Sequence, residues 1–317
     1  MRVLLAGATG YIGQAVLREL AAKGHEVIAL ARPGHALVVE EDQAVTVVEA
    51  DITMNTEWDS QVPPVQAVVS CLASRTGAPD DAIRVDFEAN QRLLARAERD
   101  GVAHFVLLSA ICVQKPVLAF QQAKLQFESA LYDSPVPATV IRATAFFRSL
   151  VGQLARVQAG KPFLVFGSGE VTACKPISDR DLARFMVAQL DEQREGTVQR
   201  IIGGPGPAIT PLAQAKMLCN AAGQPCRLRS LPINMFTWLR WVITPFALFS
   251  QRMAERAEFL RIAQFYASES MLVWDEATQC YDADATPEFG EDTLEDFYHA
   301  ICTGGRPPPD RREHSLF

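Results

Sequence analysis

Three glycines near the start of the sequence, Gly7, Gly10 and Gly13, have the spacing of a loop that holds a pyrophosphate group. They follow the apolar run VLLA and precede a helical pattern of apolar residues, so the predicted order is strand, tight turn and helix. Glycine permits the turn, lets the backbone approach phosphate oxygens without a Cβ in the way, and lets the helix pack closely on the strand. We therefore expect a dinucleotide to bind at this turn, at Gly7, Thr9, Gly10, Tyr11, Ile12 and Gly13.

Arg32 indicates which dinucleotide is bound. It follows the second apolar run, residues 27–31, and has no acidic neighbour. In dinucleotide-binding folds an acid at that place bonds the adenosine ribose of NAD, whereas an arginine suits the extra phosphate of NADP. We therefore predict NADPH as the cofactor, and the alternative is a solvated arginine. Further cofactor contacts are expected where later apolar runs end, at Asp51, Cys71, Leu72 and Ala73.

The elements that must position these residues alternate regularly along the first half of the chain. Helical patterns alternate with short apolar runs that predict strands, at 45–48, 67–70, 104–108 and 138–141. This alternation is typical of an α/β fold with a Rossmann-type, doubly wound parallel sheet. We predict that residues 1–145 form this NADP-binding domain. Residues 146–302 are predicted to form a smaller C-terminal substrate lobe, partly interleaved with the Rossmann core, and residues 303–317 a disordered tail.

The composition excludes several classes of protein. With 317 residues and 49% hydrophobic content the chain can bury a large core, so extensive disorder is not expected. The formal charge of −7 and the lack of a basic block argue against nucleic-acid binding. The seven cysteines form no CxxC pair, which favours reduced thiols over disulfides or a bound metal. The first residues lack the features of a signal peptide, and we expect a cytoplasmic location.

The most aromatic stretch of the chain is residues 231–250. Its length approaches that of a bilayer span, but Asn234, Arg240 and Pro245 interrupt it, so we do not predict a transmembrane helix. Two alternatives remain. The favoured one is a buried or lid helix over a large apolar ligand, because apolar helices usually belong to the core. The other is a segment that lies at a membrane surface.

Six runs of the sequence are more specific than the glycine spacing: VVSCLASRTG (68–77), HFVLLSAICVQKP (104–116), AFFRSL (145–150), ACKPIS (173–178), IIGGPG (201–206) and YASESMLV (266–273). Together they resemble the NADPH-dependent divinyl (proto)chlorophyllide a 8-vinyl reductases, which are atypical short-chain dehydrogenases of the NmrA-like type. The resemblance extends from residue 3 to residue 298. It implies an oxidoreductase of chlorophyll and bacteriochlorophyll biosynthesis that reduces the 8-vinyl group of a magnesium tetrapyrrole to ethyl. The membrane alternative for residues 231–250 then refers to the photosynthetic membrane.

Short-chain dehydrogenases that reduce carbonyl groups carry a YxxxK motif, in which the tyrosine protonates the developing alkoxide and the lysine holds the nicotinamide ribose. This sequence has FQQAK at 120–124, so Lys124 is kept and Phe120 replaces the phenol. Hydride addition to a vinyl group conjugated with the macrocycle spreads the negative charge over the ring, which reduces the need for an adjacent acid. We expect Lys124 to act in catalysis through the ribose, together with Ser109 and Cys112. Cys112 and Lys115 are the candidate proton donors.

Aromatic residues of the later lobe are expected to wall an apolar cleft for the pigment, because a flat macrocycle gains most from stacking and burial. The candidates, each equally plausible as a core residue, are Phe146, Phe147, Phe163, Phe166 and Trp238. Lys175 or Arg142 is expected to meet the ring's propionate. Two non-catalytic alternatives remain: a redox-sensing regulator of the NmrA type and a structural accessory subunit with bound NADPH. The kept Lys124 favours the enzyme.

Overall fold

The computed structural model describes residues 1–35, 37, 44–54, 57–247 and 250–305. The chain forms two compact units, each assembled from separate stretches of sequence. Unit 1 contains Met1–Ser74, Pro79–Ala143 and Asp179–Ile201, and unit 2 contains Arg75–Ala78, Thr144–Ser178 and Ile202–Phe317. The tail predicted to be disordered lies outside the described residues from position 306 onward.

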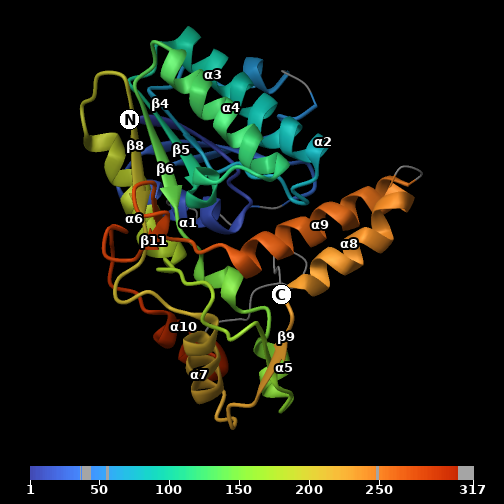
Figure 1. Ribbon diagram of the computed structural model, residues 1–317. Coiled ribbons are helices and arrows are strands. Elements are labelled where there is room, and N and C mark those ends of the chain that lie inside the picture. The colour runs from blue at the N-terminus through green and yellow to red at the C-terminus, as the bar shows by residue number, and fades with distance from the viewer. Residues whose placement is uncertain (36, 38–43, 55–56, 248–249, 306–317) are drawn as a thin grey trace. The chain divides into compact units, whose positions relative to one another are not determined.

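Unit 1 is built on a seven-stranded sheet with the order β3-β2-β1-β4-β5-β6-β8 (Figure 1). The strands are β1 (Arg2–Ala6), β2 (Glu26–Ala31), β3 (Val45–Glu49), β4 (Ala67–Ser70), β5 (His104–Ala110), β6 (Ala138–Ala143) and β8 (Thr197–Ile202). Neighbouring strands from β3 to β6 run parallel, and β1 and β4 are buried almost throughout, as strands covered on both faces must be. The predicted Rossmann-type sheet is confirmed. The strand order reverses between β1 and β4, where such folds bind their ligands.

Helices cover both faces of this sheet (Figure 1). One face carries α2 (Pro79–Ala82), α3 (Ala89–Asp100) and α4 (Ala119–Asp133), and the other carries α1 (Tyr11–Ala22) and α6 (Asp179–Ala188). A π-helical turn, Ile83–Glu88, joins α2 to α3. The core beneath α3 and α4 includes Leu93, Phe105 and Phe127, all fully buried. The rings of Phe105 and Phe127 lie 5.8 Å apart between centroids, so α4 is fixed against β5.

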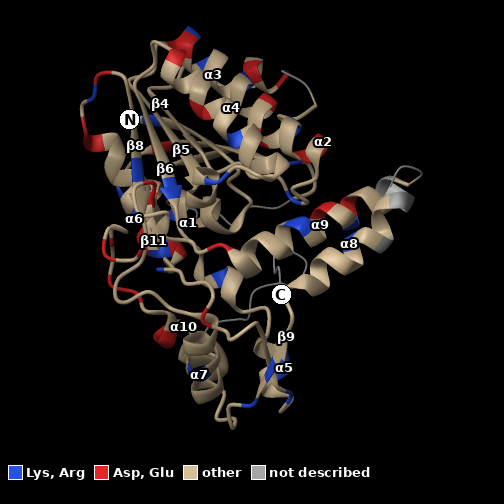
Figure 2. Ribbon diagram, viewed as in Figure 1, with Lys and Arg blue, Asp and Glu red and all other residues tan. Residues whose placement is uncertain are grey.

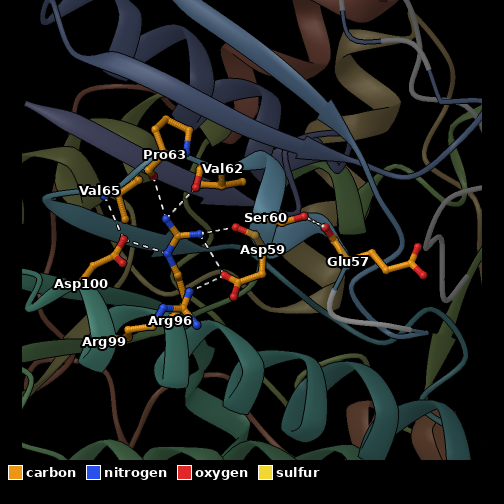
Figure 3. Close-up of polar contacts among 9 residues, drawn as sticks. All are labelled: Glu57, Asp59, Ser60, Val62, Pro63, Val65, Arg96, Arg99 and Asp100. Atoms are coloured by element: carbon orange, nitrogen blue, oxygen red, sulfur yellow. Dashed lines mark hydrogen bonds and ion pairs between the residues drawn. The ribbon is translucent and has the colours of Figure 1, made fainter.

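A buried arginine fastens the connection between β3 and β4 to α3 (Figure 3). The Arg96 side chain is almost fully buried and uses all five of its N–H donors. Its acceptors are the Asp100 carboxylate at 2.8 Å, the carboxylate and carbonyl of Asp59, both at 2.9 Å, and the carbonyls of Val62 and Pro63. Because a buried guanidinium is tolerated only when every donor is satisfied, this network fixes the path of residues 59–63.

Unit 2 has two small sheets and most of the remaining helices. β7 (Phe163–Phe166) pairs in parallel with β9 (Leu228–Leu231), and β10 (Val273–Asp275) pairs with β11 (Cys280–Asp282). The helices are α5 (Leu154–Gln158), α7 (Pro211–Ala221), α8 (Asn234–Ala247), α9 (Gln251–Ser268) and α10 (Leu294–Cys302). The Thr210 side chain caps α7, and a proline occupies its first turn. α8 and α9 pack side by side as a helical hairpin (Figure 1).

The helices that the structure describes are too short or too polar to cross a membrane. Across the described parts of the chain, no helix combines the length and the apolar character that a bilayer crossing requires.

His104 makes the stability of unit 1 depend on pH. Its ring is buried at the start of β5, with Nε2 2.8 Å from the Thr139 hydroxyl. Burial, aided by the charge of Arg194, lowers the pKa of His104 to about 4. Below its ordinary pKa of about 6.5, the unfolded chain binds a proton that the folded chain does not, so stability falls as pH drops from about 6.5 toward 4.

We expect His104→Gln to remove about 2 kcal/mol of the stability loss between about pH 7 and about pH 5. Urea unfolding of the parent and the variant at both pH values measures this difference. An equal loss in the two proteins would assign the acid sensitivity to other groups.

Candidate functional site

The glycine turn between β1 and α1 has the geometry of a phosphate cradle. Gly7 has a φ of +79°, and a Cβ there would lie 2.7 Å from the Cys71 carbonyl oxygen. A Cβ on Gly13 would lie 2.0 Å from the Gly7 carbonyl oxygen. The helix α1 therefore approaches the turn more closely than a residue other than glycine at position 13 would allow. A Cβ on Gly10 would meet only the Gly7 carbonyl, at 3.3 Å. Gly7 and Gly13 are therefore required by the fold, whereas a Cβ on Gly10 would make a single tight contact, at the N-terminus of a helix.

The other residues of this turn, Thr9, Tyr11 and Ile12, are each fixed by a different contact. Ile12 is buried, and the carbonyl of Thr9 accepts a hydrogen bond from the Gln14 side chain at 3.0 Å. The Tyr11 hydroxyl donates to the Asp179 carboxylate at 2.8 Å, which ties α1 to the start of α6. The tyrosine side chain thus fixes the two helices, and the turn offers its backbone to a ligand.

The turn after β4 lies directly beside the glycine turn. The Cys71 amide donates to the Ala6 carbonyl at 2.9 Å, and the strands β1 and β4 are in register up to this point. Burial raises the pKa of the Cys71 thiol to about 12, although the charge of Lys124 acts in the opposite direction. The thiol is therefore neutral. Leu72 is half-buried and Ala73 is exposed. The predicted contacts at 71–73 and at the glycine turn belong to one edge of the sheet.

Arg32 and Asp51 occupy the same edge farther along the sheet. Arg32 is exposed immediately after β2, and Asp51 follows β3, which pairs in parallel with β2. The Asp51 carboxylate accepts the amide and the hydroxyl of Thr53 at 2.9 and 2.6 Å, so its position is fixed by a local turn.

Lys124 is paired with an acid that the sequence did not reveal. Its Nζ lies 2.9 Å from Oδ1 of Asp86, whose side chain is completely buried in the π-helical turn. The Asp86 carboxylate also accepts the amide of Ser74, at 3.3 and 3.4 Å to its two oxygens. One turn later, the Asn90 side chain accepts the Ser70 hydroxyl at 2.6 Å and donates to the Asp86 carbonyl at 3.0 Å. The lysine is thus joined to the turn after β4.

Ser109 belongs to a second buried group of charges. Its hydroxyl donates to Glu128 Oε1 at 2.5 Å, and Arg142 donates to Glu128 Oε2 at 2.5 and 3.1 Å. Glu128 lies four residues after Lys124 in α4, so the two share a helix face, and that spacing was a signal that could have identified it. The Ser109 hydroxyl and the Arg142 guanidinium are both bonded to Glu128. Ser109 can therefore contact a ligand mainly through its backbone.

Gln121 holds the run 109–116 against α4. Its side chain accepts the amides of Val117 and Leu118 at 2.8 and 2.9 Å and donates to the Cys112 carbonyl at 2.9 Å. Cys112 itself is buried in the short turn Ile111–Gln114. Phe120 is half-buried one helical turn before Lys124. The loop is therefore bonded to the first turn of α4, the helix that also carries Phe120 and Lys124.

The residues predicted to contact the pigment lie in unit 2, in three kinds of environment, except Arg142, which belongs to unit 1 and is paired there with Glu128. Phe147 and Phe163 are almost fully buried in the core of unit 2. Phe146 and Phe166 are half-buried, and the Phe166 ring lies 4.9 Å from that of Phe236. Trp238 is 76% exposed. Lys175 is buried, with Nζ 2.5 Å from the Glu288 carboxylate and 3.4 Å from the Thr286 carbonyl. Their contacts with a pigment stay predictions.

Metal binding is not indicated within the described ranges, where no group of three or more histidine, cysteine and acidic side chains could hold an ion. What unit 1 presents instead is a glycine cradle, a helix N-terminus, and an anchored lysine at the carboxyl edge of a parallel sheet. These features fit a nicotinamide dinucleotide.

Known proteins support this interpretation. A family model described as NAD(P)H-binding matches residues 7–193. The chain is 41% identical to a chloroplastic divinyl chlorophyllide a 8-vinyl-reductase of Oryza sativa subsp. indica, over 99% of this chain and 82% of that protein. The protein of the same name from Arabidopsis thaliana is 40% identical over 96% of this chain and 78% of its own length. A solved structure of UDP-glucuronic acid 4-epimerase from Bacillus cereus, with UDP-glucuronic acid and NAD, is similar in fold: the TM-score is 0.62 at 19% identity, covering 73% of this chain and 86% of that one.

Two glycine substitutions separate binding from folding at the cradle. Gly10→Ala should fold, because its Cβ meets one atom at 3.3 Å, but should weaken dinucleotide binding by about 10-fold or more, since the methyl group would stand where we expect the pyrophosphate. Gly13→Ala should instead lower the free energy of unfolding by about 3 kcal/mol or more, because overpacking displaces α1. Titration calorimetry and denaturant unfolding measure the two effects. A Gly10→Ala protein with unchanged affinity would place the pyrophosphate elsewhere.

Proposed function

The chain belongs to the divinyl chlorophyllide a 8-vinyl-reductase family, and on that premise we propose that it reduces the 8-vinyl group of divinyl chlorophyllide or protochlorophyllide to ethyl, with NADPH as the cofactor. Two observations carry this proposal. The chain is 41% identical to such a reductase over 99% of its length, and it combines a glycine cradle with a Lys124 that is anchored by an ion pair. Together they favour an enzyme over the two non-catalytic alternatives.

The replacement of tyrosine by Phe120 is compatible with this reaction. NADPH supplies a hydride, and its addition to the terminal vinyl carbon leaves a carbanion that is conjugated with the macrocycle. The negative charge is then distributed over the ring and does not build up on one oxygen, so no phenol is required beside it. The proton needed at the adjacent carbon can come from water, from Cys112 in the 3₁₀ turn after β5, or from Lys115, which directly follows that turn.

We assign Lys124 the role of orienting the nicotinamide ribose, with Asp86 as a positioning residue. A lysine side chain has four rotatable bonds, and an ion pair of 2.9 Å with a fully buried carboxylate restricts them. The same carboxylate is bonded to the amide of Ser74, in the turn that follows β4. Movement of that turn and movement of the ammonium group are thereby coupled. The backbone of Ser109–Cys112 completes the surface on which the nicotinamide rests.

We propose NADPH as the cofactor because Arg32 is exposed at the carboxyl end of β2, where the adenosine ribose lies in dinucleotide-binding folds. For the pigment we propose stacking on Phe146, Phe166 and Trp238, which retain accessible surface, and an ionic contact of the propionate with Lys175. Phe147 and Phe163 would support this surface from beneath. We also propose a peripheral contact with the photosynthetic membrane through residues 231–250.

The cofactor proposal is tested by measuring turnover of a divinyl pigment with NADPH and with NADH, with the reaction monitored by the absorption of the pigment. Arg32→Ala should weaken NADPH binding by about 10- to 100-fold, the value of one lost charge-assisted contact, and should leave NADH binding nearly unchanged. Arg18→Ala, which removes another exposed arginine of unit 1, is the matched control. No turnover with either cofactor would refute the proposed reaction, and an equal loss for both cofactors would refute the role of Arg32.

The positioning role of Asp86 predicts a specific kinetic pattern. Lys124→Ala should lower kcat by about 100-fold while NADPH still binds, and Asp86→Asn should lower kcat by about 10-fold with little change in the KM for the pigment. Asp86→Glu should recover part of the loss, because it keeps the charge. Phe120→Tyr should give no large gain, and Lys216→Ala, an exposed lysine of α7, should have no effect. Unchanged kcat in Asp86→Asn would remove the pair from the mechanism.

A further inference from the structure

Three large apolar side chains on α8 are unusually exposed to solvent. Trp238, Leu239 and Trp241 are 76%, 44% and 83% exposed, and we call them the tryptophan face. The opposite side of the same helix is already used, because Phe236 is buried against Ala263 and Ala267 of α9. Among the described residues, α9 buries one side of α8, and no apolar neighbour buries the tryptophan face.

The charge around this face is opposite in sign to that of the chain. Residues 227–254 contain four arginines and no aspartate or glutamate, whereas the whole chain has a formal charge of −7. Arg227 and Arg229 are exposed in and next to β9, which leads directly into α8. Figure 2 shows α8 without red along its length, while red appears on α9. A local positive charge on an acidic protein selects an anionic partner.

We propose that the tryptophan face, together with Arg227 and Arg229, docks on the headgroup region of a bilayer that contains anionic lipids. This docking surface rests on the proposed membrane contact of residues 231–250 and specifies its side chains and the charge of the lipid. Indole rings combine an apolar body with one N–H donor and concentrate at the level of lipid headgroups. Because no described helix can span a bilayer, the contact is peripheral. It brings the chain to the phase into which an apolar macrocycle partitions.

The tryptophans themselves provide the first measurement. The chain has four, of which Trp58 is fully buried and Trp274 is half-buried, so Trp238 and Trp241 dominate any contact with lipid. Vesicles with brominated acyl chains and about 30% phosphatidylglycerol should quench the fluorescence, and neutral phosphatidylcholine vesicles should quench it much less. Quenching that is absent, or independent of lipid charge, would overturn the proposal.

Flotation with the same vesicles tests the residues. The double variant Leu239→Ser, Trp241→Ser should reduce binding at least about 10-fold, and Arg227→Gln with Arg229→Gln should reduce both binding and its dependence on salt. Tyr132→Ser, which removes a 51% exposed aromatic side chain from α4, should bind like the parent. If the double variant binds vesicles normally but changes the molecular mass measured by light scattering, the face is an interface between copies and the proposal fails.

Turnover distinguishes this inference from the proposed reaction. The double variant should reduce detergent-dispersed pigment at the parent's rate and should lose activity only toward pigment held in vesicles. Absence of turnover by the parent in both forms would refute the reaction while the flotation result still stands. Equal activity of parent and variant toward vesicle-held pigment would refute the docking surface.

Discussion

The contact between α1 and the turn after β1 is the constraint on which the site depends. With 2.0 Å between the place of a Gly13 Cβ and the Gly7 carbonyl oxygen, any larger residue would push the helix away from the sheet. The N-terminus of the helix would then no longer point toward the switch point of the sheet. The packing of α1 on α6, fixed by Tyr11 and Asp179, depends on the same approach. A single backbone contact thus sets both the phosphate cradle and one covering layer of the fold.

Buried ion pairs perform a different task in unit 1. The pairs Lys124–Asp86, Arg142–Glu128 and Arg96–Asp100 each bring together side chains that are largely buried. Such pairs add little net stability, because desolvation offsets the attraction, but a broken pair leaves an uncompensated charge and is costly. Each therefore fixes a geometry more than it strengthens the fold. Two of them include residues of α4, so that helix is held in place at two points, as the proposed role of Lys124 requires.

Local sequence patterns were sufficient for strands β1 to β6 and for the glycine turn between β1 and α1, but not for β8, which joins the same sheet although it lies beyond the predicted domain end at residue 145. Apolar runs and glycine spacing are properties of neighbouring residues, and strands β1 to β6 occur where they were predicted. Asp86 could not be identified in this way, because its partner Lys124 lies far away in the sequence and the π-helical turn breaks the 3.6-residue period that links position to helix face. The aromatic residues of the later lobe show a second limit. Hydrophobicity alone does not distinguish Phe147, which lies in the core, from Trp238, which lies on the surface.

The interleaving of the two units has a consequence for the ribosome-bound chain. The last strand of the large sheet, β8, is Thr197–Ile202, and its neighbour β6 ends at Ala143. Between them the chain contributes Thr144–Ser178 to unit 2 and then α6 to unit 1. Until β8 emerges, β6 remains an unpaired edge that can add a foreign strand. The nascent protein therefore passes through a stage in which most of unit 1 but only a small part of unit 2 is synthesised and neither is closed, and this stage is where chaperones have the most to protect.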